Sequence, residues 1–326
     1  MSKVRSTTLG LFPLPDPAKE ELSDLKGHQK DDLIDGTESE ATERAYDDAR
    51  EAVVDWQLES GLDRIVEGQL RWDDMIAHPL SVHDNVETRG IVRYYDNNNF
   101  YREPVVTGDL TFDGDVADDL AADPEINQAI LPGPYSLSEL ATDEHYGDEA
   151  AFLDAVSEFL AEEAAAFDVE TLFLLEPSLV TDPPEDGEDE RASRAIDTVT
   201  GETDADVVTQ TYWGALEEKV YAHLMDAGID AIGFDFVTDH EQNLYNIQEY
   251  GTKEQISLGI VDGQNTLVEE PAEIRDRVEW VEENTPNEDF ERVYATPNTE
   301  LFYLPVNKTR QKLDALAAVG RTEVTQ

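Results

Sequence analysis

The sequence predicts an α/β fold, and within that class a (β/α)8 TIM barrel that occupies residues 1–326 as one domain. Three observations predict it. Short apolar runs recur eight times, helical or loop-forming stretches separate them, and no Gly-x-Gly-x-x-Gly or Gly-Lys-Ser/Thr phosphate loop is present. Strands that alternate with helices and are apolar throughout are typical of parallel sheets buried on both faces. Eight of them favour a closed barrel, a fold for which about 250 residues is a common length.

Each expected strand is a short run of apolar or β-branched residues. The runs cover residues 7–12, 64–68, 128–133, 171–177, 207–212, 231–237, 256–262 and 292–298. Between them, apolar residues recur at helical spacing. Phe152 and Val156 begin one apolar stripe, and a second runs from Leu216 to Leu224 before Gly228, a residue type that often ends helices.

Two segments interrupt the alternation of strands and helices. Residues 89–115 have two strand-like halves around the turn-rich Asp-Asn-Asn-Asn, and they predict a hairpin insertion after the second strand. Residues 181–206 are acidic and contain Pro and Gly, so we expect a solvated connection with one short helix after the fourth strand. Neither segment has the character of a domain boundary.

The charge of the chain is extreme. The 75 Asp and Glu residues outnumber the 23 Lys and Arg residues, which gives a formal net charge of −52. The magnitude that keeps a small domain soluble is only about 2–8. Because about 1 M salt shortens the Debye length to about 3 Å, concentrated salt would remove most of the self-repulsion. The acids are interleaved with apolar positions, so we expect a halophilic protein of a high-salt cytosol, and no nucleic-acid partner.

Residue types that are missing exclude several classes of protein. There is no cysteine, which excludes disulfides, thiolate metal ligands and cysteine nucleophiles from this chain. No apolar run approaches the roughly 18 residues of a membrane span, and the first residues lack the apolar core of a signal peptide. We therefore expect a cytoplasmic protein that is not bound to a membrane.

In a barrel, functional residues gather at the carboxyl ends of the strands. Five elements at these ends carry a recognisable pattern: Thr7-Thr8-Leu9-Gly10-Leu11-Phe12-Pro13, Gly68-Gln69 with Asp74-Met75, Pro132-Gly133-Pro134-Tyr135-Ser136, Leu175-Glu176-Pro177, and Gly259 with Asp262 and Asn265. In this order they resemble the cobalamin-independent methionine synthase family, whose members transfer a methyl group from 5-methyltetrahydrofolate to a zinc-bound homocysteine thiolate. The resemblance extends from about residue 7 to residue 316. It implies a barrel similar to the zinc-free N-terminal half of the long, two-barrel members.

The departures from the family pattern are as informative as the matches. Thr209, Thr211, Asp235 and Thr299 stand where the resemblance places the zinc ligands. Threonine hydroxyls are poor Zn²⁺ ligands compared with imidazole and thiolate. Three further changes affect the expected substrate pocket: Leu175 replaces an acid, Gln69 replaces Glu and Leu11 replaces Ser.

The resemblance therefore implies a component of a split methionine synthase. Such a chain would bind no cofactor itself and would act beside a separate barrel that carries the zinc. An alternative is a stand-alone methyltransferase of the same family with a substituted site or a different methyl donor, such as a corrinoid or tetrapyrrole. A scaffold without a ligand is the third possibility.

Several residues are candidates for substrate binding. Basic residues are scarce here, and a folate-type ligand carries carboxylates that the fork of an arginine recognises. The basic candidates are Arg71, Arg89, Arg93, Arg102 and Lys253, of which Arg71 and Arg102 fit the expected barrel mouth best. The neutral Gln69 is a further candidate for substrate binding. Aromatic residues that could stack on a pterin are Tyr94, Tyr95, Phe100, Tyr101, Tyr212 and Trp213, although aromatics at such places more often serve packing.

Three carboxylates lie at the ends of expected strands, namely Glu176, Asp235 and Asp262. They could act as a general acid or base if burial raised their pKa values, or they could hold loop amides, and for Glu176 and Asp262 we favour the second role. The six histidines lack ligand spacing. A metal site made of His240 and Asp235 is an open but weaker alternative.

Overall fold

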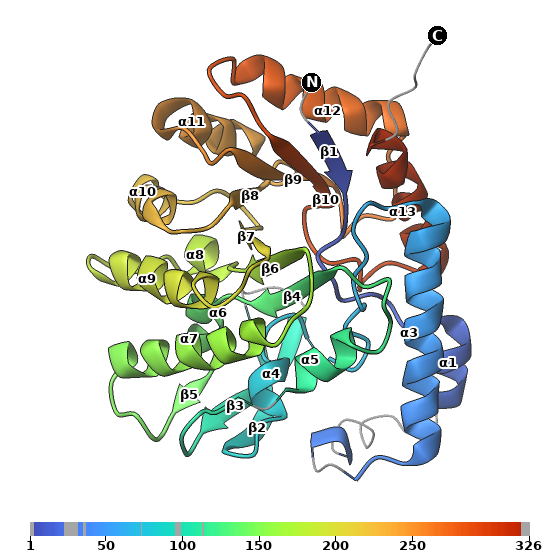
Figure 1. Cartoon of the computed structure of the whole chain (residues 1–326), viewed down its shortest axis with the longest axis vertical. Helices are drawn as coiled ribbons and strands as arrows, with labels where there is room; N and C mark the ends of the chain where they lie inside the picture. Colours follow the sequence, from blue (N-terminus) through green and yellow to red (C-terminus); the bar gives the residue numbers. More distant parts are fainter. Residues whose placement is uncertain are drawn as a thin grey trace.

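The computed structural model describes residues 3–22, 32–34, 37–72, 74–94, 99–112 and 114–320. In this part of the chain a curled parallel sheet of seven strands forms the centre, and helices surround it (Figure 1). In sheet order the strands are β1 (Lys3–Ser6), β10 (Arg292–Pro297), β9 (Gln255–Val261), β8 (Ala231–Asp235), β7 (Asp206–Gln210), β6 (Thr171–Leu175) and β4 (Gln128–Pro132). The parallel α/β architecture predicted from the sequence is confirmed.

Long helices cover the outer face of this sheet (Figure 1). They are α3 (Glu40–Ser60), α7 (Glu149–Ala165), α9 (Glu188–Thr200), α10 (Glu218–Asp226), α11 (His240–Tyr250), α12 (Pro271–Asn284) and α13 (Val306–Gly320). Short helices lie in the connections: α1 (Asp16–Glu21), α4 (His78–Ser81), α5 (Asp115–Leu120), α6 (Pro134–Glu139) and α8 (Ser178–Thr181). No helix among the described residues is long and apolar enough to cross a lipid bilayer.

Two of the expected strands differ from the structure. The first strand ends at Ser6, and residues 7–12, which were predicted as a strand, form an irregular turn with Gly10 at φ 76°. Residues 64–68 do not form a strand at all. They still connect the two edges of the sheet, because Arg64 N–H donates to Ser6 O (3.2 Å) and Ile65 O accepts from Gln128 N–H (3.2 Å).

A side chain explains why residues 64–68 form no strand ladder. The Gln57 amide on α3 accepts a hydrogen bond from Val66 N–H (3.0 Å) and donates one to Val66 O (2.8 Å). Asn127 Oδ1 accepts from Ile65 N–H at 2.8 Å. Side-chain amides thus satisfy backbone groups that a β-ladder would otherwise use.

The two interruptions of the alternation take different forms. The antiparallel strands β2 (Val86–Tyr94) and β3 (Asn99–Val106) cover the predicted hairpin, and β3 also pairs with the short β5 (Thr142–Asp143). The turn between β2 and β3 lies outside the described residues. The acidic segment 181–206 is less exposed than predicted, because α9 buries Ala192, Ile196 and other apolar side chains in the core.

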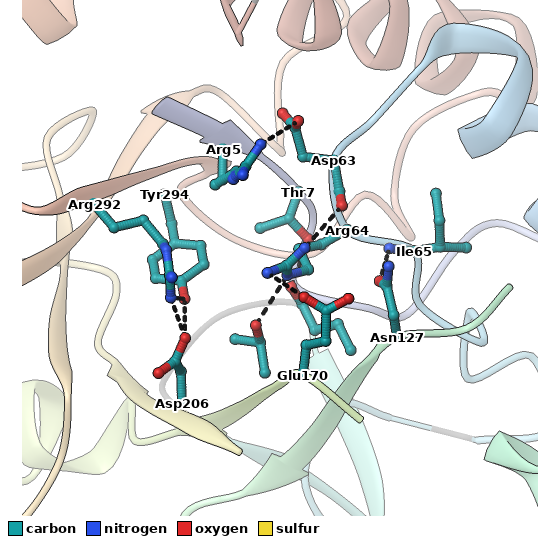
Figure 2. Close-up of polar contacts among 12 residues, drawn as sticks. Arg5, Thr7, Asp63, Arg64, Ile65, Asn127, Glu170, Asp206, Arg292 and Tyr294 are labelled. Atoms are coloured by element: carbon teal, nitrogen blue, oxygen red, sulfur yellow. Dashed lines mark hydrogen bonds and ion pairs between the residues drawn. The ribbon is translucent and has the colours of Figure 1, made fainter. Parts of the chain in front are cut away.

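Scarce basic residues are used at the amino ends of the strands (Figure 2). Arg292, the first residue of β10, pairs with Asp206 and donates to Gln255 Oε1 at 3.0 Å. The Arg64 guanidinium lies 2.8 Å from Glu170, and Arg5 lies 3.1 Å from Asp63. In barrel folds this end serves stability, whereas the carboxyl ends carry function, so the search for a site turns to the opposite end.

We expect Gly233→Ala to destabilise the protein. A Cβ atom at Gly233 on β8 would lie 2.1 Å from Gln210 Oε1 and 3.0 Å from Gln210 Cα, so Gln210 would lose its 2.7 Å bond to Ser257. Overpacking of this kind costs about 1–3 kcal/mol, to be measured by urea unfolding in high salt. Gly90→Ala is the matched control, because a Cβ atom there meets nothing within 4 Å. Equal stability of the two variants would contradict this account of the interior.

Candidate active site

Backbone strain gathers at the carboxyl ends of the strands. Among the described residues, three that are not glycine have left-handed backbone angles: Leu11 (φ 41°), Gln69 (φ 53°) and Trp213 (φ 70°). Leu11 lies in the turn after β1, and Gln69 and Trp213 directly follow the second and fifth of the strands expected from the sequence. Because such a conformation costs about 1–3 kcal/mol and persists mainly at functional sites, these turns mark the candidate site.

Tyr212 reaches across this end of the sheet from the loop after β7. Its side chain is fully buried, and its hydroxyl lies 2.9 Å from Glu300 Oε1 and 3.1 Å from Met75 Sδ. Glu300 follows β10, and Met75 lies in the loop before α4. The three side chains close the centre of the strand ends to solvent, since Met75 and Glu300 are each 1% exposed.

Glu300 is an unusual carboxylate. Its Oε1 accepts the Tyr212 hydrogen bond, but its buried Oε2 has no hydrogen-bond partner in the described part of the chain. Burial raises the pKa of this carboxyl to about 7, although hydrogen bonds, including that from Tyr212, act in the opposite direction.

The side chains of β7 point alternately to the two faces of the sheet. Gln210 Oε1 lies 2.7 Å from Ser257 Oγ, two strands away on β9, so the side chains of Gln210 and Tyr212 project over the inner face. Because side chains alternate along a strand, Thr209 faces the other way. Thr211 Oγ1 donates to Gly233 O (2.9 Å), and the buried Thr209 Oγ1 has no partner among the described residues. That these threonines stand at the family's zinc positions stays a prediction.

Glu176 follows β6 and is completely buried. Its carboxylate accepts from Tyr135 N–H (3.0 Å), Ser136 N–H (2.8 Å) and Ser136 Oγ (2.7 Å), all at the start of α6. Burial raises its pKa to about 7, and the hydrogen bonds from Ser136 and Tyr135 oppose that rise. Glu176 thus fixes the loop after β4.

Asp235 holds a second set of loops at the end of β8. Its oxygens accept from Trp213 N–H (2.9 Å), Val237 N–H (3.0 Å) and Thr238 N–H (2.8 Å), and Asn298 Nδ2 lies 3.2 Å from both oxygens. Burial raises the pKa of this carboxyl above its ordinary range. The left-handed turn at Trp213 depends on this contact.

The predicted substrate-binding residues lie in different surroundings. Gln69 is buried, with its Oε1 bonded to Leu11 N–H (2.9 Å), while its Nε2 has no partner among the described residues. Arg71 pairs with Glu38, and its guanidinium lies 5.1 Å from the centre of the Tyr46 ring. Arg102 is half buried on β3, and Trp213 is half buried beside Tyr212. The structure therefore brings Tyr212 and Trp213 together, whereas Arg71 is already engaged by an acid.

Other basic and aromatic candidates already contact protein groups or lie outside the described residues. Arg89 pairs with Glu144, and Lys253 Nζ donates to Met225 O and Ala227 O. Tyr101 is buried on β3. Tyr95, and the side chains of Tyr94 and Phe100, lie outside the described residues.

A cavity of about 640 Å³ opens beside the closed centre, at the ends of β8 and β9. Asp262, one of the predicted acid or base candidates, lines it, and its Oδ1 accepts from Gln264 N–H at 2.9 Å. The His240 ring also lines it and packs against Trp280, with ring centres 5.8 Å apart. Within the described ranges, no three His, Asp or Glu side chains are grouped as metal ligands.

Comparison with known proteins defines the class to which this fold and these loops belong. A family profile described as "Cobalamin-independent synthase, N-terminal domain" matches residues 82–286, more than half of the chain. The chain therefore belongs to the cobalamin-independent methionine synthase family, as the strand-end motifs predicted.

The curated relatives are longer proteins. A 5-methyltetrahydropteroyltriglutamate–homocysteine methyltransferase of Bacillus velezensis is 26% identical over 186 residues, which cover 55% of this chain and 23% of that protein. One from Bacillus licheniformis is 28% identical over 136 residues, which cover 41% of this chain and 17% of that protein. This chain thus matches a quarter or less of the length of these relatives.

Solved structures show the same fold over the whole chain. A B12-independent methionine synthase from Shewanella, solved in complex with selenomethionine, superposes with a TM-score of 0.74 at 18% identity and covers 98% of this chain and 97% of that one. A methyltransferase from Methanosarcina mazei has a TM-score of 0.59 at 12% identity and covers 98% and 94% of the two chains. At these identities the likeness concerns the fold alone.

Sequence reasoning missed Glu300 and the inward position of Gln210. Glu300 directly follows Thr299, the last residue considered at the eighth strand. Alternation along the expected strand 207–212 could have indicated that Gln210 and Tyr212 share one face.

We expect Glu300→Gln to change the pH dependence of stability. Burial raises the folded-state pKa of Glu300 from 4.5 to about 7. The protonated carboxyl therefore contributes fully to the free energy of unfolding below pH 4.5, and this contribution is lost as the pH rises through about 7. Glutamine keeps an acceptor for Tyr212 and cannot ionise. Relative to wild type, the variant should gain roughly 2–4 kcal/mol in free energy of unfolding between pH 4.5 and pH 8.

Urea unfolding at both pH values in high salt measures this difference. Glu51→Gln, on the exposed face of α3, is the control and should show no comparable gain. If Glu300→Gln differed from the wild type by the same free energy of unfolding at both pH values, the raised pKa of Glu300 would be refuted.

Proposed function

We propose that this protein takes part in methyl transfer from a methyltetrahydrofolate-type donor to homocysteine, as the zinc-free component of a split methionine synthase. One observation carries the proposal: a chain of this family lacks every cysteine. The named activity of its relatives is 5-methyltetrahydropteroyltriglutamate–homocysteine methyltransfer, and they contain much more chain than this protein matches.

The residues at the carboxyl ends are a poor fit for a catalytic zinc ion. Zinc in such sites is bound by imidazole, thiolate and carboxylate groups. Asp235, the only fully buried aspartate in the part of the chain that the structure describes, already accepts hydrogen bonds from three backbone N–H groups and Asn298. We therefore assign no step of the reaction to a metal held by this chain.

In the proposed complex this chain binds and orients ligands. Glu176 and Asp235 fix the loops that would face the methyl donor. Gln69, Arg71, Arg102, Tyr212 and Trp213 remain the proposed contacts for that donor. Since Arg71 pairs with Glu38, a carboxylate of a folate tail would have to compete with that acid.

A reconstitution experiment tests the proposal. Protein purified in molar KCl should contain no stoichiometric zinc by metal analysis and should not methylate homocysteine alone. Adding a zinc-bearing barrel of the same family should produce methionine faster than that barrel does by itself.

The partner barrel alone is the control for this experiment. Methyl transfer by the lone chain would overturn the split-enzyme proposal and favour the stand-alone methyltransferase. If this chain and the partner barrel, alone or together, produced no methionine from folate donors but did so from a methyl-corrinoid, the methyl donor would be a corrinoid.

We also propose that the protein works in a high-salt cytosol. The formal charge of −52 supports this, because self-repulsion at that charge is large unless salt screens it. Many of the acids are exposed on helices, as along α3 and α12.

Thermal unfolding tests the salt proposal. The midpoint should rise by roughly 10 °C or more between about 0.1 M and about 2 M KCl, because screening relieves the repulsion between acids. Sucrose at matched osmolality separates screening from exclusion of the solute from the surface. A midpoint that does not change with KCl would contradict the proposal.

A further inference from the structure

The cavity beside the closed strand ends has no role in the proposed methyl transfer. Residues of α11, α12 and the loops that follow β8 and β9 line it. Its volume of about 640 Å³ is within the range of roughly 300–1,000 Å³ that is usual for small-molecule sites.

The walls of the cavity are held in place by buried polar contacts. Lys312 on α13 is 1% exposed, and its Nζ donates to Leu267 O and Glu269 Oε2, both at 2.6 Å. Glu269 Oε1 accepts from Asp262 N–H at 2.8 Å. Arg277 on α12 donates to Ile260 O on β9. The loop after β9 is therefore fixed to α13, and α12 is fixed to β9, so the cavity is preformed.

The lining combines aromatic and apolar surface with acids. Trp280 is 38% exposed and Leu267 is 72% exposed, so both leave apolar surface uncovered at the opening. Phe236, Val237 and the His240 ring complete this surface. Large apolar side chains left open beside a hollow are typical of ligand-binding sites.

The charged side chains that line the cavity favour a positively charged ligand. Four carboxylates line the cavity, those of Asp262, Glu269, Glu273 and Asp276, against one guanidinium, that of Arg277. Glu269 is neutralised by Lys312, and one oxygen of Glu273 accepts the Glu270 N–H in the capping box of α12. Asp276 is exposed one turn before Trp280 on α12, so its carboxylate and the indole border the opening together.

We propose that this cavity binds a small organic amine, a protonated primary ammonium group attached to a planar or apolar body. The body would pack on Trp280, Phe236 and Leu267, while the ammonium would pair with Asp276 and Asp262. An ammonium near an indole also gains cation–π attraction. This site is independent of the methyl transfer proposed above and does not require a partner barrel.

Binding of tryptamine tests the proposal, measured by isothermal titration calorimetry on the full chain in about 1 M KCl, where the Debye length is about 3 Å. This salt suppresses long-range attraction by the net charge, so only close contacts remain. Tryptophol and indole-3-propionate carry the same indole with a neutral and an anionic group. We expect saturable one-to-one binding of tryptamine, at least about fivefold weaker binding of tryptophol, and none of indole-3-propionate.

Two variants locate the site. Trp280→Ala should weaken tryptamine binding about three- to tenfold, and Asp276→Asn about two- to fivefold. Leu58→Ala and Asp55→Asn, on the exposed face of α3, are matched controls and should bind like the wild type. Both Trp280 and Asp276 lie at the surface, so thermal unfolding should confirm that their variants fold.

Three results would overturn the proposal. One is the absence of saturable binding at millimolar tryptamine. Another is equal affinity for tryptamine and tryptophol. The third is binding that neither Trp280→Ala nor Asp276→Asn weakens. Because none of these experiments involves methyl transfer, their failure would leave the split-enzyme proposal untouched.

Discussion

Two buried carboxylates, Glu176 and Asp235, hold the carboxyl ends of the sheet together. Glu176 bonds the start of α6, and Asp235 bonds the loops after β7 and β8 and also Asn298 after β10. A buried carboxylate is costly unless several donors satisfy it, and here each accepts three or more hydrogen bonds. Loops that no regular structure supports are thereby fixed in position, including the strained turn at Trp213.

The scarcity of basic residues shapes the rest of the molecule. With 23 Lys and Arg against 75 acids, each buried cation has a specific structural task. Arg64 and Arg292 join strand beginnings at the amino end, and Lys312 fixes the loop after β9. Few cations are then left to bind an anionic substrate, as the pairing of Arg71 with Glu38 illustrates. In the proposed complex, a methyl donor with several carboxylates would therefore need contacts other than ion pairs with this chain.

The carboxyl ends contain two regions of different character. The centre is filled by Tyr212, Met75 and Glu300, and the polar atoms Gln69 Nε2 and Glu300 Oε2 are buried there without partners in the described part of the chain. Beside it, the cavity at α11 and α12 is open, preformed and lined by rings and acids. Asn298 links the loop after β9 to the end of β8, because its Oδ1 accepts from Gly263 N–H (2.9 Å) while its Nδ2 bonds Asp235.

The sequence by itself determined the parallel α/β class, the position of most strands and the family, because apolar runs and turn motifs are local features of the chain. It also determined that no thiolate exists here. Only the tertiary structure decided that Gln57 and Asn127 replace a strand ladder at residues 64–68, that Tyr212 reaches Glu300, and that α9 is packed into the core. Those outcomes depend on which side chains meet in space, over separations from 9 positions between Gln57 and Val66 to 88 positions between Tyr212 and Glu300, and no hydrophobic pattern in the sequence encodes such pairings.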